Sequence, residues 1–450
     1  MHNPKPAFVR ACRNMGSGLV LICTAGSALG AQREGGGSSM FRGNAARTGV
    51  AAGSPLTSFT GVKWTFHTNG RIISSPAVVG GIAYIASTDG NVYAVDTDNG
   101  TKIWAYNTGV RVTSSPAVAG GAVFVASYDG GFYAIDANAG TLRWMVPSEG
   151  ERRFAGKHLN LRPPAGEKAP DPFDVYLSSP VVYDGLVYFG SGDGNVYAID
   201  VAAGQIRWKF KTGNVIHASP TIADGLLYIG SWDTYFYALN AKTGKMVWRF
   251  KTGEDTLASN QTGIQGTAAV SGGVVYFECR DAHLYALNAL TGEKKWAYST
   301  GGSWGMSSPA VRDGKVWFTT ADGRGFNEVD AATGKRNFVI RLSWYFSASP
   351  TIVGKYAYVG NWDGRFIAVN LDSHSIAWMF QTDSSRANMG KYINADSTMS
   401  YSSTMTERFV EDYPIEFAKI FSMGSFLSSA AVVDGVVYVG STDGNLYALK

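Results

Sequence analysis

Residues 178–210 read SSPVVYDGLVYFGSGDGNVYAIDVAAGQIRWKF, a stretch that combines strand-forming runs with regularly placed turns. The apolar runs are four to six residues long and are bounded by Asp184-Gly185, Asp193-Gly194 and Ala203-Gly204. Asp-Gly supplies the positive φ that a two-residue hairpin turn requires. Each run is therefore predicted to be a β-strand, and the whole stretch to be four antiparallel strands joined by tight turns.

The same unit of about 40 residues recurs along the chain, marked by three landmarks that each occur eight times. The Ser-Ser-Pro start recurs at Ser75, Ser115, Ser179, Ser219, Thr267, Ser308, Ser349 and Ser429. The second turn carries Asp89, Asp129, Asp193, Asp233, Asp281, Asp322, Asp363 and Asp443. The last strand carries Trp64, Trp104, Trp144, Trp208, Trp248, Trp296, Phe338 and Trp378. Four strands in a unit of this length are typical of a propeller blade, so the sequence predicts an all-β fold, an eight-bladed β-propeller of four-stranded antiparallel blades.

The two ends of the repeat predict how the ring closes. The last unit stops at Tyr447-Ala448-Leu449-Lys450 without a fourth strand, while residues 62–67 form a fourth strand with no blade before them. We expect this N-terminal strand to complete the last blade, because the pairing removes two open sheet edges.

The first 31 residues differ from the repeat and are interpreted as a signal peptide. Lys5, Arg10 and Arg13 precede an apolar run at 19–29, which is too short to span a membrane. The domain boundaries predicted are therefore a signal peptide at 1–31, a lead-in at 32–61 and the propeller at 62–450. The mature protein is expected to be periplasmic or secreted, with no transmembrane segment.

Charge and cysteine content narrow the function classes. Three of the 39 basic residues and none of the 35 acidic ones lie in residues 1–31, so the exported chain would carry 36 against 35, a net charge of +1. Nucleic-acid binding needs a clustered basic surface, and no nucleic-acid partner is expected. Cys12 and Cys23 leave with the signal, so Cys279 is the only mature cysteine and no intramolecular disulfide forms. We expect Cys279 to be an ordinary strand-end residue.

The repeat, from Ser179-Pro180-Val181-Val182 to Trp208-Lys209-Phe210, resembles the pyrroloquinoline quinone (PQQ) type of propeller repeat. The resemblance covers about residues 39–450, including the lead-in Phe41-Arg42-Gly43-Asn44. This repeat is shared by quinoprotein alcohol dehydrogenases and by BamB, the propeller subunit of the outer-membrane β-barrel assembly machinery. The resemblance implies that the Ser-Ser-Pro strand is innermost, and it leaves the function open.

Three inserts interrupt the spacing, at 145–177, 251–265 and 381–427. All three follow a Trp-bearing strand, so they lie on the face that also carries the aspartate turns. Long loops on one face predict a functional face, with a lid or collar over the central channel. In the third insert, residues 406–411 and 415–421 predict one or two short helices that pack on the rim, cover the channel or dock a partner.

Aromatic, histidine and basic residues on this face are the candidates for binding a ligand or partner. The aromatic side chains offer a stacking surface if they are exposed, or pack under the inserts if they are not. No metal site is predicted, because His67 and His217 lie on blades far apart. The repeated aspartates are interpreted as turn residues that accept backbone hydrogen bonds. The candidates are Arg71, Arg111, His158, Arg162, His217, Trp232, Arg280, Trp304, Trp344 and Trp362.

Three functions fit these features, and the binding hypothesis is favoured: an exported, BamB-like scaffold that holds a protein, peptide or glycan partner, which could be associated with the outer membrane. It needs no cofactor. The alternative is a PQQ-dependent dehydrogenase with PQQ and Ca²⁺, in which Glu278 or Asn394 would reach the metal; the adjacent-cysteine pair that the family resemblance implies is missing. The third is an enzyme acting on polysaccharides, with His158 or His217 as base and Arg162 or Arg280 against a carboxylate.

Overall fold

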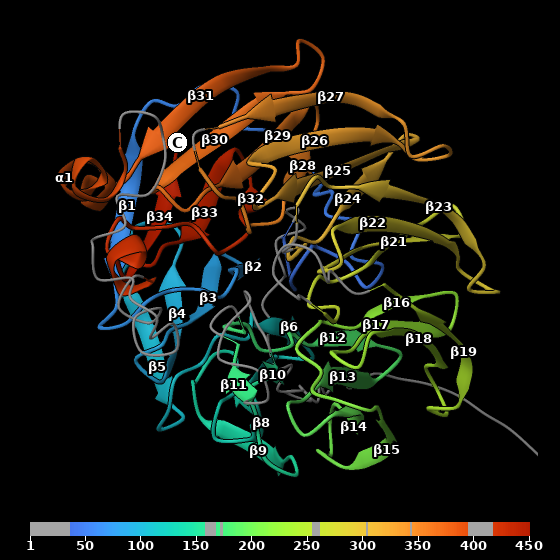
Figure 1. The fold of residues 1–450 in the computed structure, drawn as a ribbon. Coiled ribbons are helices and arrows are strands. Elements are labelled where there is room, and N and C mark those ends of the chain that lie inside the picture. Colours follow the sequence, from blue (N-terminus) through green and yellow to red (C-terminus); the bar gives the residue numbers. More distant parts are fainter. Residues whose placement is uncertain are drawn as a thin grey trace, which may run out of the picture. The chain divides into compact units, whose positions relative to one another are not determined.

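The computed structural model describes residues 37–157, 168–171, 174–253, 262–302, 305–342, 344–394 and 417–450. Eight four-stranded antiparallel sheets form the blades of a ring, as Figure 1 shows. The predicted eight-bladed β-propeller is confirmed. Among the described residues, no helix is both long enough and apolar enough to cross a membrane.

The blades follow one another in chain order, each running from the channel to the rim. Blade 1 holds β2 (Ala77–Val79), β3 (Ile82–Ala86), β4 (Asn91–Asp96) and β5 (Lys102–Asn107). Blade 2 holds β6 (Ala117–Ala119), β7 (Ala122–Ala126), β8 (Gly131–Asp136) and β9 (Leu142–Pro147). Blade 3 holds β12 (Val181–Tyr183), β13 (Leu186–Gly190), β14 (Asn195–Asp200) and β15 (Ile206–Lys211). Blade 4 holds β16 (Thr221–Ala223), β17 (Leu226–Gly230), β18 (Tyr235–Asn240) and β19 (Met246–Lys251).

The second half of the ring repeats this arrangement. Blade 5 holds β20 (Ala269–Ser271), β21 (Val274–Cys279), β22 (His283–Asn288) and β23 (Lys294–Ser299). Blade 6 holds β24 (Ala310–Arg312), β25 (Lys315–Thr320), β26 (Gly325–Asp330) and β27 (Arg336–Arg341). Blade 7 holds β28 (Thr351–Val353), β29 (Tyr356–Gly360), β30 (Arg365–Asn370) and β31 (Ser375–Gln381). Blade 8 holds β32 (Ala431–Val433), β33 (Val436–Gly440), β34 (Asn445–Leu449) and β1 (Val62–His67).

Strand β1 closes the ring as predicted. It pairs antiparallel with β34, with Trp64 opposite Ala448 and Phe66 opposite Leu446. Figure 1 shows the blue β1 beside the red β34, which come from the two ends of the sequence. Strand β1 is therefore the outer strand of blade 8, and β34 is not left as a free edge.

Burial along a blade explains why the apolar runs differ from strand to strand. The second and third strands of a blade lie between neighbouring blades and are buried on both faces; Leu186–Gly190 and Asn195–Asp200 are examples. Strands buried on both faces read as continuous apolar runs. The fourth strand, such as Ile206–Lys211, lies at the rim and alternates between exposed and half-buried residues.

The rim tryptophans join each blade to the next. Trp104 Nε1 donates to the Ala137 carbonyl oxygen at 2.9 Å, and Trp208 Nε1 donates to that of Ala241 at 2.9 Å. The rings also cover the turn glycines of the next blade, so that a Cβ on Gly244 would lie 2.7 Å from Trp208. Each tryptophan therefore contributes packing and a directed hydrogen bond.

The lead-in follows the inner strands around the channel end opposite the inserts. The amide nitrogens of Val118 and Ile222 donate to Ser39 and Ala45, and that of Val311 donates to Thr48. The buried guanidinium of Arg47 donates to carbonyl oxygens of blades 3 and 4, including Pro180 at 2.8 Å and Pro220 at 3.2 Å. That of Arg42 donates to Pro309 and Pro350 in blades 6 and 7. The lead-in thus closes one end of the channel.

The inserts carry the remaining regular structure. The first contains a small hairpin of β10 (Ala155–Lys157) and β11 (Lys168–Pro170). The third begins with α1 (Asp383–Tyr392), which the sequence analysis missed; its Thr382 cap accepts a hydrogen bond from the Ser385 amide. Residues 417–421 are helical, within the predicted 415–421, whereas the predicted helix at 406–411 lies outside the described residues.

Candidate functional site

The loops between blades and the aspartate turns share one face. The Thr88 amide of a second turn donates to the Arg71 carbonyl oxygen, and the Thr108 amide donates to that of Gly90. Asp89 accepts from the Asn91 amide at 3.0 Å and from the Tyr93 hydroxyl at 2.8 Å. The interpretation of these aspartates as turn residues is confirmed at Asp89.

The central channel has side chains across both ends and encloses little free space. Phe41 of the lead-in lines one end, and Tyr176 of the first insert lies across the other. The Tyr176 hydroxyl donates to the Leu427 carbonyl oxygen at 3.3 Å and lies 3.2 Å from Ser347 Oγ. The cavity between the two ends measures ≈ 40 Å³. A water molecule needs about 10–15 Å³ by this measure, so the channel holds roughly three.

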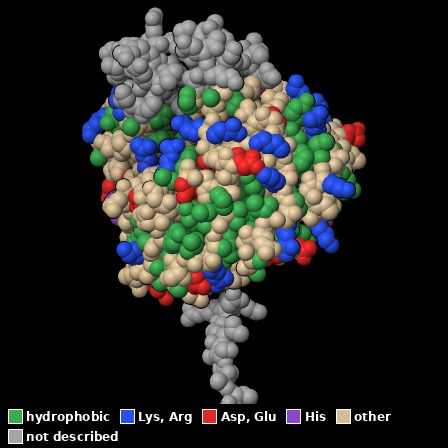
Figure 2. Space-filling view, turned by 90° about the horizontal axis from the view of Figure 1, so that it is seen from below, with side chains coloured by type: hydrophobic (Ala, Val, Ile, Leu, Met, Phe, Trp, Pro, Cys, Tyr) green, Lys and Arg blue, Asp and Glu red, His purple; other side chains and the backbone are tan. Residues whose placement is uncertain are grey.

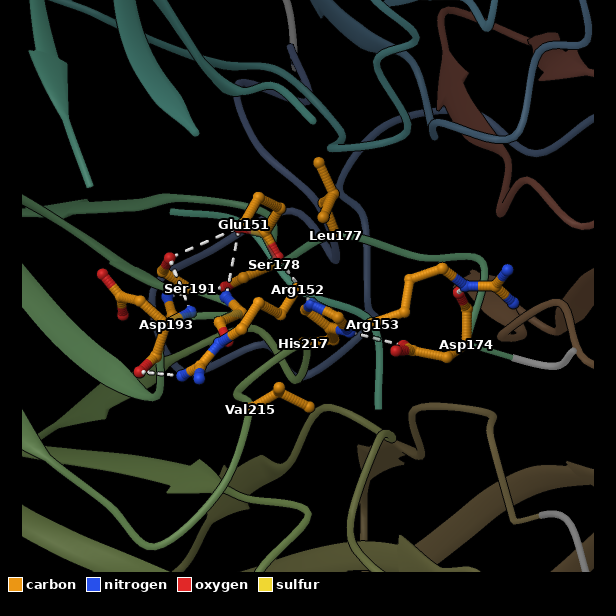
Figure 3. Close-up of polar contacts among 12 residues, drawn as sticks. Glu151, Arg152, Arg153, Asp174, Leu177, Ser178, Ser191, Asp193, Val215 and His217 are labelled. Atoms are coloured by element: carbon orange, nitrogen blue, oxygen red, sulfur yellow. Dashed lines mark hydrogen bonds and ion pairs between the residues drawn. The ribbon is translucent and has the colours of Figure 1, made fainter. Parts of the chain in front are cut away.

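His217 lies at the channel mouth in a buried ionic network, shown in Figure 3. Its Nδ1 bonds to the Asp174 carboxylate, and its Nε2 lies 2.8 Å from Glu151 Oε1. The second oxygen of Glu151 accepts from the Gly192 amide at 3.1 Å, in the second turn of blade 3. The second oxygen of Asp174 accepts from the Phe154 amide at 2.6 Å. The network therefore fixes both ends of the first insert to blades 3 and 4.

The charge state of His217 follows from these contacts. Burial disfavours the charged ring, but the charges of Asp174 and Glu151 and their hydrogen bonds outweigh burial and raise the pKa of His217 to about 10. Both ring nitrogens are then donors, and a general base needs a free lone pair. In this arrangement His217 positions the insert and does not have the free nitrogen that the polysaccharide-enzyme hypothesis requires.

Arg280 holds the same insert by a second buried ion pair. Its Nη1 lies 2.7 Å from Asp171 Oδ2, and both side chains are fully buried. The guanidinium carbon also lies 4.5 Å from the ring centroid of Trp232. On the same indole, Phe154 stacks with a centroid separation of 4.4 Å. Arg280 and Trp232 therefore anchor the first insert from blades 5 and 4.

The expectation of an exposed aromatic surface is wrong for three of the four candidate tryptophans. Trp232, Trp344 and Trp362 are 2%, 0% and 2% exposed. Trp344 and Trp362 belong to an apolar cluster over the channel mouth, together with Phe417 and Phe421 of the third insert. The other interpretation of the sequence, packing under the inserts, holds for them, because burial removes large apolar surfaces from water.

The remaining candidates divide into two groups. Trp304, His158 and Arg162 lie outside the described residues. Arg71 and Arg111 are brought together in a cavity of ≈ 220 Å³ between blades 1 and 2. The sequence analysis did not single out Glu151, Asp171, Asp174 or Tyr176; the available signal was that charged residues cluster at the two ends of the first insert, next to the blades.

The PQQ and calcium pair of the dehydrogenase hypothesis does not fit the channel mouth. The ≈ 40 Å³ cavity is far smaller than a three-ring quinone, since Tyr176, Leu177 and Met306 occupy its rim. Glu278 is buried, accepts from the Ser307 amide at 3.0 Å, and burial raises its pKa well above the ordinary value. Within the described ranges, no three His, Cys, Asp or Glu residues are grouped so that they could hold a metal ion. Cys279 is a free, buried residue at the end of β21, as expected.

Surface charge on the side drawn in Figure 2 is mixed, with Lys and Arg interspersed with Asp and Glu around a band of hydrophobic side chains. Lys and Arg predominate in the upper part of this view, and most Asp and Glu lie lower or at its edges.

Comparisons with known proteins agree with this architecture. The model of the family described as outer membrane protein assembly factor BamB matches residues 58–167, 168–378 and 299–406. BamB from Moraxella catarrhalis superimposes with a TM-score of 0.62 at 16% identity, covering 87% of this chain and 99% of that one. A comparison with curated proteins finds no match.

Dehydrogenases share the fold equally well. A europium-containing methanol dehydrogenase superimposes with a TM-score of 0.65 at 16% identity, covering 91% of each chain. The quinohemoprotein alcohol dehydrogenase from Comamonas testosteroni gives 0.66 at 14% identity, covering 92% of this chain and 80% of that one. Likeness at such identities establishes the fold alone.

Proposed function

Because the chain belongs to the family of the outer membrane protein assembly factor BamB, we propose that it is a binding scaffold that holds a protein partner on its insert-bearing face. The observation that carries this proposal is that buried ion pairs attach the first insert to the blades. Three buried ion pairs hold its described ends over the narrow channel: His217 with Asp174, His217 with Glu151, and Arg280 with Asp171. Fixed attachment points for the insert suit recognition of a macromolecule, since preorganised surfaces lose less entropy on binding.

The apolar cluster of the third insert supports the same proposal. Trp362 contacts both Phe417 and Phe421 with ring centroids 5.7 and 6.3 Å apart, so this insert is also packed onto the blades. The described parts of both inserts therefore pack on the same face of the propeller. Partner recognition by such a face needs no chemistry inside the channel.

The proposed location is the periplasm. Its support is the N-terminal sequence, with basic residues before the apolar run at 19–29, and membership in a family named for outer-membrane assembly. An outer-membrane-associated protein is the partner that this location favours.

Site-specific photo-crosslinking in the envelope of the source cell tests the proposal. A photoreactive amino acid at Asn69 or Val110, both exposed on the insert-bearing face, is expected to give a discrete crosslinked protein. The matched control positions are Asp184 and Asp224, in first turns that point to the opposite face. Equal crosslinks from both faces, or crosslinks from the control positions alone, would contradict the proposal.

The dehydrogenase alternative has its own measurement. A ligand that binds the native state raises the melting temperature. Because we expect no binding, titration of the purified mature protein with PQQ and Ca²⁺ should leave the melting temperature unchanged. A saturable rise in melting temperature together with a bound-quinone spectrum would replace the scaffold by a dehydrogenase.

A further inference from the structure

A second cavity, outside the channel, opens where two inserts and two blades meet on the insert-bearing face. Its volume is ≈ 220 Å³. The residues that give it its character are Arg71, Arg111, Tyr128, Arg153, Phe417 and Phe421. The first two arginines come from the loops that precede blades 1 and 2, Arg153 comes from the first insert, and the phenylalanines come from the third.

Two of the arginines are held by aromatic rings and have unused hydrogen-bond donors. The guanidinium carbon of Arg111 lies 4.0 Å from the ring centroid of Tyr128, and that of Arg71 lies 4.9 Å from that of Phe421. Within the part of the chain that the structure describes, neither guanidinium forms an ion pair or donates a hydrogen bond. A guanidinium whose face rests on a ring keeps its N–H edges available for a carboxylate or phosphate.

The acidic group nearest to them is already in use. Asp174 is the one carboxylate among the described lining residues, and its oxygens bond to His217 and to the Phe154 amide. The Arg153 guanidinium donates hydrogen bonds to the carbonyl oxygens of Asp174 and Asp171. The described lining residues therefore carry an excess of positive charge. Burial also lowers the pKa of Arg71, because it removes water from around the charged guanidinium.

We propose that this cavity binds a small organic anion whose carboxylate or phosphate group is held by Arg71 and Arg111 and whose apolar part lies against Phe417 and Phe421. A cavity of about 150 Å³ holds a benzene ring, so ≈ 220 Å³ accommodates one ring or a short chain with one or two acidic groups. This goes beyond the proposed scaffold, because it assigns a small-molecule site that would tie the first and third inserts together.

Calorimetric titration of the mature protein with phthalate, inorganic phosphate and neutral benzamide tests the site. We expect saturable binding of phthalate, weakened by added salt, and no binding of benzamide. Displacement of phthalate by inorganic phosphate would show that any oxyanion suffices, whereas phthalate binding that phosphate leaves unchanged would assign the site to carboxylates.

Variants locate the binding within the protein. Arg71→Met and Arg111→Met keep the apolar stem and are each expected to weaken phthalate binding on the order of tenfold or more, because each removes a charge-assisted hydrogen bond. Arg249→Met is the matched control: Arg249 rests on Tyr235 at 4.6 Å on the rim, away from the cavity. Arg111→Lys should retain only part of the affinity, since lysine keeps the charge and loses the planar edge.

Three results would overturn the assignment: no binding of either anion at 10 mM (roughly −2.7 kcal/mol as a limit), unchanged affinity in both Met variants, or an equal loss in Arg249→Met. These results are independent of the crosslinking experiment, which needs no small anion. Failure of one proposal therefore leaves the other standing.

Discussion

At the scale of single residues, His217 shows how a residue of catalytic type becomes a structural one. The side chain is fully buried between two carboxylates, both of which belong to the first insert. A buried charge is tolerated only when it is paired and hydrogen-bonded, and here both nitrogens are. The imidazolium therefore joins the insert to the propeller.

Replacing His217 should release the insert. His217→Gln leaves Asp174 and Glu151 close together without the positive charge, and breaking a buried ion pair costs about 3–5 kcal/mol of unfolding free energy. Hydrogen exchange should show faster exchange at residues 151–157 and 174–177. His67→Gln is the control, since exposed His67 bonds through its side chain only to Asn445, at 2.9 Å, among the described residues and should change stability by less than about 0.5 kcal/mol. Equal effects of the two substitutions would contradict the role of the network.

The same residue predicts a pH dependence. The folded pKa of His217, about 10, exceeds the ordinary value of 6.5, so its contribution is complete below pH 6.5 and is lost as the pH rises toward 10. We expect unfolding free energy to fall between pH 7 and 9.5, by at most roughly 1.4 kcal/mol per pH unit. Denaturant titrations across this range measure the slope, which should be absent in His217→Gln. A flat wild-type profile would contradict the raised pKa.

At the scale of elements, the contact between a rim tryptophan and a turn glycine is the repeating joint of the ring. Gly244 has φ +71° and lies under Trp208, while Gly225 of the same blade has φ +75° and open space where a Cβ would lie. Both positions need a left-handed backbone, so both favour glycine. The two positions differ in that a tryptophan of the neighbouring blade covers Gly244 and leaves Gly225 open.

This pair separates backbone strain from blade packing. Gly225→Ala should cost about 1 kcal/mol of unfolding free energy through strain alone. Gly244→Ala should cost a further 1–3 kcal/mol (approximately), because its Cβ would lie 2.7 Å from the Trp208 ring and force it away. Thermal or denaturant unfolding of both variants measures the difference. Equal losses in the two variants would contradict the prediction, because they would show that the Trp208 ring moves aside at no cost in stability.

At the scale of the whole molecule, the N-terminal part of the described chain closes the ring of blades. Strand β1 completes blade 8, and the lead-in before it bonds to the inner strands around the ring. Blades that contact only their neighbours are thereby linked through a shared central segment. Its two buried arginines bring donors to carbonyl oxygens that the blades leave unpaired at the channel.

Arg47 should therefore matter to the stability of the entire ring. Arg47→Met removes donors from the carbonyl oxygens of Ser179, Pro180 and Pro220, and unpaired buried acceptors cost about 1–3 kcal/mol each. We expect a loss of several kcal/mol in cooperative unfolding, measured by denaturant titration. Arg207→Met is the control, because the Arg207–Asp200 pair at 2.7 Å lies at the surface, where ion pairs contribute little to stability. Similar losses in the two variants would refute a central role for the lead-in.

The sequence alone determined the blade number, the strand order and the closure. These depend on local rules repeated at a fixed spacing: apolar runs, Asp-Gly turns, and a tryptophan four residues after a glycine. Each rule acts within one blade or between neighbours, so eight copies reinforce one another. Turn roles such as that of Asp89 followed for the same reason.

Only the tertiary structure determined how the inserts pack on their face of the ring, because the inserts do not repeat. His217 meets Asp174 and Glu151 across 43 and 66 residues, and Phe421 rests on Arg71 from the far end of the chain. Such contacts form wherever a long loop can bury apolar surface and pair its charges. The repeat spacing of the sequence does not specify where on the propeller this happens. The burial of Trp232, Trp344 and Trp362 depends on the same choice: their loop positions were visible in the sequence, whereas the inserts that cover them were placed only by the fold.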